Sequence, residues 1–148
     1  MSVLVINGPN LNTLGQREPE IYGPTTLEQV EARMRAYGKA LGLTLEFFQS
    51  NSEGAILDCI QQQGASAQAI VINPGALAHT SVALRDSLSA LSVPVVEVHI
   101  SNVHAREPFR HHSYIASVVT GQVVGLGTHG YLLALGYLAE AANLGGTP

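Results

Sequence analysis

Short apolar runs and helix-like apolar periodicities alternate along the chain. Apolar runs of strand length stand at residues 3–7, 43–48, 69–72, 95–98 and 118–124. Between them, apolar residues recur every three or four positions, which is typical of helices that pack on one side. This periodicity predicts helices over residues 27–41, 56–60, 80–91 and 131–142. Thr25 and Glu28 have the spacing of a capping box, and Thr80 is the predicted cap of the third helix.

The order of these elements predicts the fold. Strands that alternate with helices form right-handed βαβ units, and such units build a parallel sheet with helices on both faces. Five strands in 148 residues predict an α/β, flavodoxin-like three-layer sandwich with a five-stranded parallel sheet and a single domain over residues 1–148. Residues 10–23 form a long connection, which we call the lid because such connections are often mobile covers of a site. The last residues, 144–148, are predicted to be a loose tail.

Composition narrows the classes of function. Hydrophobic residues make up 46% of the chain and charged residues 12%, against a usual charged share of about 25%. This balance predicts a folded core and indicates a surface partly covered by other subunits of a homo-oligomer. The net charge of −4 argues against a nucleic-acid partner, and no apolar stretch reaches the ~20 residues that cross a membrane. The start lacks the features of a secretory signal, and the single cysteine, Cys59, fits a reducing compartment, so we expect a cytoplasmic protein.

The topology also predicts where chemistry takes place. In open parallel sheets, ligands bind beyond the carboxyl ends of the strands. The first, third and fourth predicted strands end at residues 7–10, 73–75 and 99–101, which are rich in polar side chains and turn residues. We expect these three ends to meet in one crevice.

The lid carries Arg17 and Tyr22, with Pro19 between them. One interpretation is a plain surface loop with an exposed arginine and a half-buried tyrosine. The other makes Tyr22 a general base that Arg17 activates. A free tyrosine has a pKa of about 10, so proton abstraction at neutral pH requires about 4 kcal/mol. A guanidinium about 4 Å away supplies ~4 kcal/mol at an effective dielectric of ~20, so one well-placed arginine is enough.

Glu97 and His99 are two positions apart on the fourth predicted strand, so both side chains leave the same face of the sheet. A carboxylate beside an imidazole fixes its tautomer and favours the protonated ring, which suits a general acid. The alternative is a packed histidine in a structural ion pair. The position of His99 at the carboxyl end of a strand favours catalysis.

Other chemistries lack their sequence signals. His104, His111 and His112 do not have the spacing of metal ligands, and no glycine-rich nucleotide motif follows the first strand. No Gly-x-Ser-x-Gly motif marks a serine nucleophile. The only lysine, Lys39, lies away from every strand terminus, so Schiff-base chemistry is not expected. The leading hypothesis is therefore acid–base catalysis without a metal or cofactor.

Several motifs together carry a resemblance to a known family. They are residues 7–12 (NGPNLN), 15–23 (GQREPEIYG), 49–51 (QSN), 73–75 (NPG), 79–86 (HTSVALRD), 97–102 (EVHISN), 106–107 (RE), 109–114 (FRHHSY) and 125–127 (GLG). In these motifs, in their order and in its total length, the chain resembles the type II 3-dehydroquinate dehydratases (type II dehydroquinases). The resemblance spans nearly the whole sequence.

The resemblance implies a flavodoxin-like subunit of a dodecamer built as a tetramer of trimers. It also implies a lyase that needs no cofactor and that converts 3-dehydroquinate reversibly to 3-dehydroshikimate by anti elimination through an enolate. This reaction usually belongs to the shikimate pathway, which leads to chorismate and the aromatic amino acids. The sequence does not separate that role from quinate breakdown.

The resemblance implies roles for individual residues as well. Tyr22 removes a proton from the carbon next to the substrate ketone, Arg17 favours its ionised form, and His99 protonates the departing hydroxyl. A water held near Asn10 assists the enolate, and Glu97 remains the partner of His99. Substrate contacts are implied for Asn73, His79 and Arg110, for the backbone amides of Ile100 and Ser101, and for the Ser101 hydroxyl. Asp86 matches a residue that reaches the site of a neighbouring subunit.

The chain departs from the family pattern at a few positions. Thr13 stands where leucine is frequent, Ser52 where histidine is common, and Leu77 and Ala78 where tyrosine and threonine are frequent. None of these is a proposed acid or base.

Two hypotheses from other classes stay open. A flavodoxin-like binding module would be an electron carrier with a flavin spectrum, or a phospho-acceptor with acidic residues where Asn7 and Asn10 stand. A purely structural subunit would assemble without turnover.

Overall fold

A computed structural model describes residues 1–143, and the predicted tail over residues 144–148 lies outside the described residues. The strands are β1 (Ser2–Asn7), β2 (Thr44–Gln49), β3 (Ala69–Asn73), β4 (Val95–His99) and β5 (Gly121–Val124). They form one parallel sheet in the order β2-β1-β3-β4-β5. The predicted five-stranded parallel sheet is therefore confirmed.

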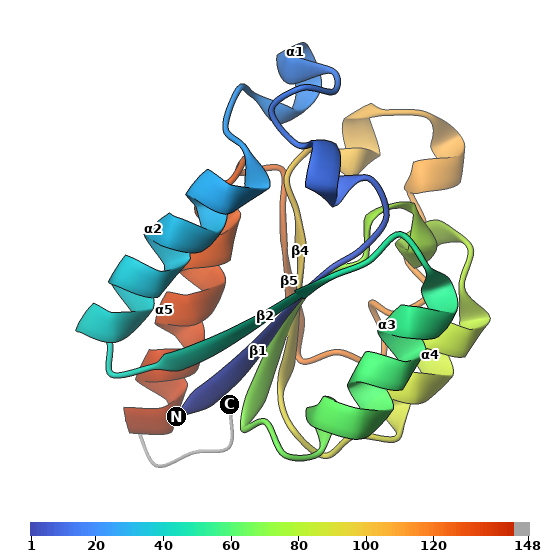
Figure 1. The fold of residues 1–148 in the computed structure, drawn as a ribbon. Coiled ribbons are helices and arrows are strands. Elements are labelled where there is room, and N and C mark those ends of the chain that lie inside the picture. Colours follow the sequence, from blue (N-terminus) through green and yellow to red (C-terminus); the bar gives the residue numbers. More distant parts are fainter. Residues whose placement is uncertain (144–148) are drawn as a thin grey trace.

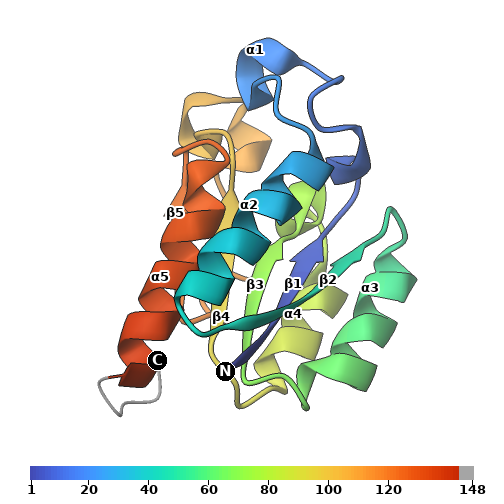
Figure 2. The same cartoon turned by 60° about the vertical axis from the view of Figure 1, so that its left-hand side comes forward.

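Helices cover both faces of this sheet (Figure 1). The helices α2 (Leu27–Ala40) and α5 (His129–Asn143) pack on one face. The helices α3 (Glu53–Cys59) and α4 (Val82–Ser89) pack on the other, and α3 continues as a π-helical turn over Ile60–Gly64. Because successive side chains of a strand point to opposite faces, the same strands supply both apolar cores. The result is the predicted three-layer sandwich (Figure 2).

Two helix starts differ from the predictions by one residue. At α2, Thr26 Oγ1 accepts a hydrogen bond from the Gln29 amide, and Gln29 Oε1 accepts one from the Thr26 amide, so the capping box uses this pair instead of Thr25 and Glu28. At α4, Ser81 Oγ accepts from the Leu84 amide. Thr80 is not the cap, because its amide closes a preceding 3-10 turn over Gly75–His79.

The strand β5 is shorter than the predicted strand over residues 118–124. The amides of Val118 and Val119 both donate to the carbonyl of Ile115, at 3.0 and 3.2 Å, and so form a turn. Their side chains pack against the core beneath α3 and α4. These β-branched residues therefore reflect core packing and not strand pairing.

The lid stands over the carboxyl ends of the strands, beside the segment that follows β4 (Figures 1 and 2). It contains a 3-10 turn, Leu11–Thr13, and a one-turn helix, α1 (Pro19–Tyr22). Among residues 1–143, no helix has the length and apolar character needed to cross a membrane.

Candidate active site

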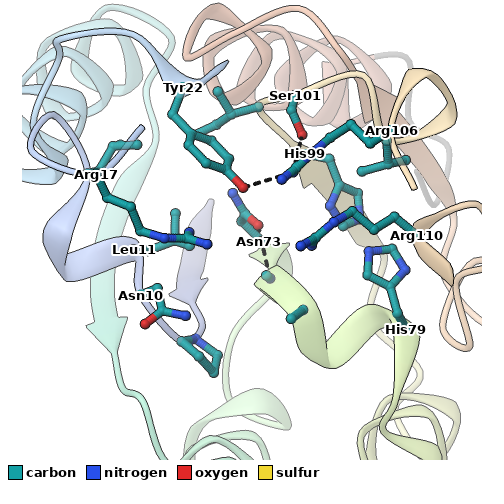
Figure 3. A pocket seen from close by; sticks show the side chains of 16 residues that line it. Asn10, Leu11, Arg17, Tyr22, Asn73, His79, His99, Ser101, Arg106 and Arg110 are labelled. Carbon is teal, nitrogen blue, oxygen red and sulfur yellow. Dashed lines mark hydrogen bonds between the residues drawn. The ribbon is translucent and has the colours of Figure 1, made fainter. Parts of the chain in front are cut away.

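A pocket lies at the carboxyl end of the sheet, under the lid (Figure 3). Residues that follow β1, β3 and β4 line it together with the lid, so the predicted meeting of three strand ends is confirmed. Its walls are formed by Pro9, Asn10, Leu11, Leu14, Arg17, Tyr22, Asn73, Gly75, Ala76, His79, His99, Ile100, Ser101, Val103, Arg106 and Arg110. The predicted site residues Asn10, Arg17, Tyr22, Asn73, His79, His99, Ile100, Ser101 and Arg110 are thus gathered in one cavity.

Two predicted site residues do not line the pocket. Glu97 is fully buried next to His99. Asp86 is exposed on α4, where it borders a separate surface depression with Gln61 and Ser87. Asp86 therefore does not contribute to the pocket of its own chain.

The pocket is strongly cationic for a chain with a net charge of −4. The guanidinium groups of Arg17, Arg106 and Arg110 line it, and none of the described residues that line it is acidic. A cleft with one sign of charge concentrates ligands of the opposite sign, and guanidinium groups pair well with carboxylates. The pocket is therefore suited to a small anionic ligand.

Two arginines flank the phenol of Tyr22 (Figure 3). Arg106 Nη1 donates a hydrogen bond of 2.8 Å to Tyr22 Oη and another of 3.1 Å to Ser101 Oγ. The guanidinium carbons of Arg17 and Arg106 each lie 5.4 Å from the centroid of the Tyr22 ring. The sequence predicts Arg17 as the partner of Tyr22, but Arg106, for which no role is predicted, makes the direct contact with the phenol oxygen. The only sequence signal for Arg106 was its place in the family motif over residues 106–107.

Backbone strain in the lid places Tyr22 over the pocket. Glu18 has φ 42°, a left-handed conformation that costs an L-residue about 1–2 kcal/mol. Its carbonyl accepts the amides of Ile21 and Tyr22, which closes the single turn of α1. Arg17 and Glu18 also form an exposed ion pair at 3.5 Å. The lid therefore turns sharply between Arg17 and Tyr22 and brings both side chains to the pocket.

His99 and Glu97 form a buried pair on β4, as their spacing predicted. His99 Nε2 lies 2.5 Å from Glu97 Oε2, and the two residues are 5% and 0% exposed. The ring of His99 is stacked on that of His79, with 6.1 Å between the centroids. The pair therefore presents one imidazole edge to the pocket while the carboxylate stays beneath it.

His79 is held as a neutral ring. Its Nδ1 lies 2.8 Å from the carbonyl oxygen of His112, and because a carbonyl only accepts, Nδ1 carries the hydrogen. Burial lowers the pKa of His79 and outweighs the hydrogen bond to His112, which raises it, while the neighbouring charges of His99 and Arg110 act in the same direction as burial. Its Nε2 is then an acceptor for a ligand hydroxyl.

A chain of buried hydrogen bonds fixes Asn73. Asn73 Nδ2 donates to Tyr131 Oη at 2.9 Å, and Tyr131 Oη donates to Asn7 Oδ1 at 2.6 Å. Asn73 Oδ1 accepts from the Gly75 amide at 3.1 Å. Burial raises the pKa of Tyr131, so its hydroxyl stays neutral. One N–H of Asn73 remains for a ligand, since an amide carries two.

The segments after β1 and β3 approach closely at Gly8. A Cβ atom on Gly8 would lie 2.5 Å from the carbonyl oxygen of Pro74, closer than such atoms come in practice. Glycine is therefore required here, and it brings Pro9 and Asn10 against the turn that carries Asn73.

The chain is similar to known proteins over nearly its whole length. The family model described as "Dehydroquinase class II" matches residues 1–139. A catabolic 3-dehydroquinase of Aspergillus clavatus is 57% identical over 138 residues, which cover 93% of this chain and 92% of that protein. A 3-dehydroquinate dehydratase of Roseiflexus castenholzii is 56% identical over 145 residues, 98% of this chain and 92% of that protein.

A solved structure shows the same fold. The type II dehydroquinase from Propionibacterium acnes matches with a TM-score of 0.91 and 49% identity, covering 94% of this chain and 96% of that one. Sequence and structure therefore agree with the resemblance carried by the motifs: the chain belongs to the class II dehydroquinase family.

Proposed function

We propose that this chain, a type II 3-dehydroquinate dehydratase, removes water from 3-dehydroquinate with Tyr22 as general base and His99 as general acid. One observation carries these roles. In a single pocket, a phenol hydrogen-bonded to a guanidinium faces an imidazole hydrogen-bonded to a buried carboxylate. The product is 3-dehydroshikimate, and the reaction is reversible. The comparisons give no support to a binding module or electron carrier.

The elimination proceeds in two steps. Tyr22 in its ionised form takes the proton from the carbon next to the substrate ketone, and the electrons of the C–H bond form an enolate. The enolate electrons then return, the carbon–carbon double bond forms, and the hydroxyl leaves as water with the proton of His99. The positive charge of Arg106, 2.8 Å from the phenol oxygen, stabilises the ionised base, and Arg17 adds to it from the lid. Asn10 is proposed to hold a water at the enolate oxygen.

The remaining polar groups of the pocket suit the other parts of the substrate. The Ser101 hydroxyl accepts from Arg106, so its own hydrogen is available for the substrate carboxylate, together with the amides of Ile100 and Ser101. Arg110, which Glu107 holds at 2.8 Å, contacts the ring hydroxyls with Asn73 and His79. We propose that the lid closes over the bound substrate and excludes water.

We further propose that the chain works as a dodecamer made of four trimers. Asp86 supports this assembly, because it is exposed on α4 and lies outside the pocket of its own chain. If Asp86 completes a neighbouring pocket, mixed assemblies of Asp86→Ala and Tyr22→Phe chains regain activity that neither variant has alone. Absence of recovery in assemblies shown to be mixed would contradict this role, and sedimentation measures the assembly size.

A cytoplasmic location is proposed as well. The lone cysteine, Cys59, is buried, and burial raises the pKa of its thiol, which makes it unreactive.

Genetic complementation distinguishes a biosynthetic from a catabolic role. Both roles have to be tested, because relatives include proteins named as catabolic. Restored growth without aromatic amino acids, in a strain that lacks its own dehydratase, supports a biosynthetic role for the chain, and growth rescued only on quinate supports a catabolic one.

The roles are tested by Tyr22→Phe, which keeps the ring and removes the base. Formation of the conjugated enone product is followed by ultraviolet absorbance with 3-dehydroquinate as substrate. We expect kcat to fall by ~10²–10⁴-fold, the usual contribution of a general base, while calorimetry still detects binding. Tyr37→Phe is the control and keeps normal turnover, since Tyr37 is partly exposed on α2 and does not line the pocket. A Tyr22→Phe enzyme with most of its kcat would rule out the assigned base.

A further inference from the structure

Glu97 is a fully buried carboxylate that accepts hydrogen bonds from three side chains. His99 Nε2 and Ser113 Oγ both contact Oε2, at 2.5 and 2.9 Å. Gln122 Nε2 donates to Oε1 at 2.9 Å. The proposed elimination uses only the contact of Glu97 with His99, so it gives no role to Ser113 and Gln122.

The fold places these two donors outside the pocket that Tyr22 and His99 line. Gln122 is paired with Glu97 in the register of β4 and β5, so the two side chains leave the same face of the sheet. Ser113 lies on the loop before β5, and its Oγ also accepts the amides of Ile115 and Ala116. Both residues line a small cavity that borders His99, and neither lines the pocket of Tyr22. A substitution of Gln122 or Ser113 therefore changes the surroundings of the Glu97–His99 pair and leaves the residues that line the pocket of Tyr22 unchanged.

Burial alone would favour transfer of the shared proton from His99 to Glu97. A charged carboxylate loses its hydration when it is buried, which favours the neutral form unless hydrogen bonds replace the lost water. In a neutral pair, the proton sits on Glu97 and the imidazole is uncharged, so its one remaining N–H is a much weaker acid toward a leaving hydroxyl than the charged ring is. The donors on Oε1 and Oε2 compensate for the lost hydration and keep the negative charge on the carboxylate.

We propose that Gln122 and Ser113 are positioning residues that hold the proton of the Glu97–His99 pair on the imidazole. They act through Glu97 and do not contact the substrate. The proposal rests on the function proposed for His99, but it concerns the protonation of that ring, which is measurable without turnover.

Other titratable groups surround the pair and are left unchanged by the test. They are the histidines His79, His104 and His111, the cations Arg17, Arg106 and Arg110, and the phenol of Tyr22, which line the two cavities that His99 borders. Their influence is the same in the parent and in each variant, so a difference between the variants reports the donors on Glu97.

The test is Gln122→Met, which keeps the length of the side chain and removes the donor. Histidine ring signals are followed by NMR across pH, and His99 is assigned from the signal missing in His99→Asn. We expect the ratio of charged to neutral His99 rings in the pair that holds one shared proton, read from the ring nitrogen signals, to fall ~10-fold, the size expected for one lost hydrogen bond to a charged group. We also expect kcat near neutral pH to fall with KM within about twofold.

Matched variants separate this role from a general loss of structure. Gln62→Met removes an exposed glutamine elsewhere and leaves the His99 ring signals unchanged. Ser113→Ala lowers the ratio of charged to neutral His99 rings, and Ser113→Thr, which keeps the hydroxyl, restores it. An unchanged ratio in folded Gln122→Met would overturn the proposal. A lowered ratio with unchanged kcat would support it and contradict the acid role of His99 instead.

Discussion

Tyr131 joins the two strand ends that carry Asn7 and Asn73. We predict that its hydroxyl contributes several kcal/mol to the free energy of unfolding. The ring is fully buried against the sheet, and its oxygen accepts from Asn73 and donates to Asn7. Tyr131→Phe keeps the ring and removes both hydrogen bonds. Among residues 1–143, the buried Asn7 Nδ2 has no hydrogen-bond partner, so without the Tyr131 hydroxyl on Oδ1 the Asn7 side chain would make no hydrogen bond.

The size of the effect follows from two buried polar atoms that lose their hydrogen-bond partner, Asn7 Oδ1 and Asn73 Nδ2. Each buried polar group left without a partner costs about 1–3 kcal/mol. Partial relaxation of the two amides reduces the sum, so we expect Tyr131→Phe to lower the free energy of unfolding by about 2–4 kcal/mol. We also expect KM for 3-dehydroquinate to rise, because Asn73 loses the contact that orients its amide toward the pocket.

Urea unfolding followed by circular dichroism measures the loss, with parent and variant at equal chain concentration. Tyr137→Phe is the control, since this tyrosine lies on the same helix with 45% of its surface exposed and is expected to change stability by less than ~0.5 kcal/mol. A loss below ~1 kcal/mol in Tyr131→Phe would refute the view that this buried network holds the two strand ends.

Three further predictions concern the pocket and the chain around it. Arg106→Met removes the donor to Tyr22 and is expected to lower kcat by ~10–100-fold, the range for a hydrogen bond to a charged group, whereas a change within twofold would exclude Arg106 as the stabiliser of the base. Because burial lowers the pKa of His79, the unfolded chain binds a proton more readily, so stability falls as pH drops from the unfolded value of about 6.5 toward the lower folded one. His79→Asn removes that part of the pH dependence, and parallel stability curves for parent and variant would contradict this assignment. Borohydride added with substrate is expected to leave activity intact, and inactivation with a label on Lys39 would indicate an imine.

The fold could be predicted because its signals are local. Buried parallel strands are short apolar runs, and the helices between them repeat every three or four residues, so element order alone gave the sheet and its functional edge. The predicted helix start is one residue early because the neighbours Thr25 and Thr26 can both act as a cap. The predicted fifth strand is too long because Val118 and Val119 pack in the core without pairing in the sheet.

The contacts that support the proposed catalytic groups could not be predicted from local sequence pattern. Arg106 and Tyr22 are 84 positions apart, and Glu97 is 25 positions from Gln122 and 16 from Ser113. Spacing identified the pair on β4 because both residues share one strand. No periodicity connects side chains that only the folded sheet and the lid bring together.

We propose that a cation beside Tyr22 makes its phenol a base aimed at the substrate carbon. The most direct test is a crystal structure of the enzyme with an unreactive analogue of 3-dehydroquinate. We predict that Tyr22 Oη lies within ~3.5 Å of the carbon next to the ketone and keeps its hydrogen bond to a guanidinium. A phenol that points away from the ligand, or that contacts neither Arg17 nor Arg106 when the ligand is bound, would exclude Tyr22 as the activated base.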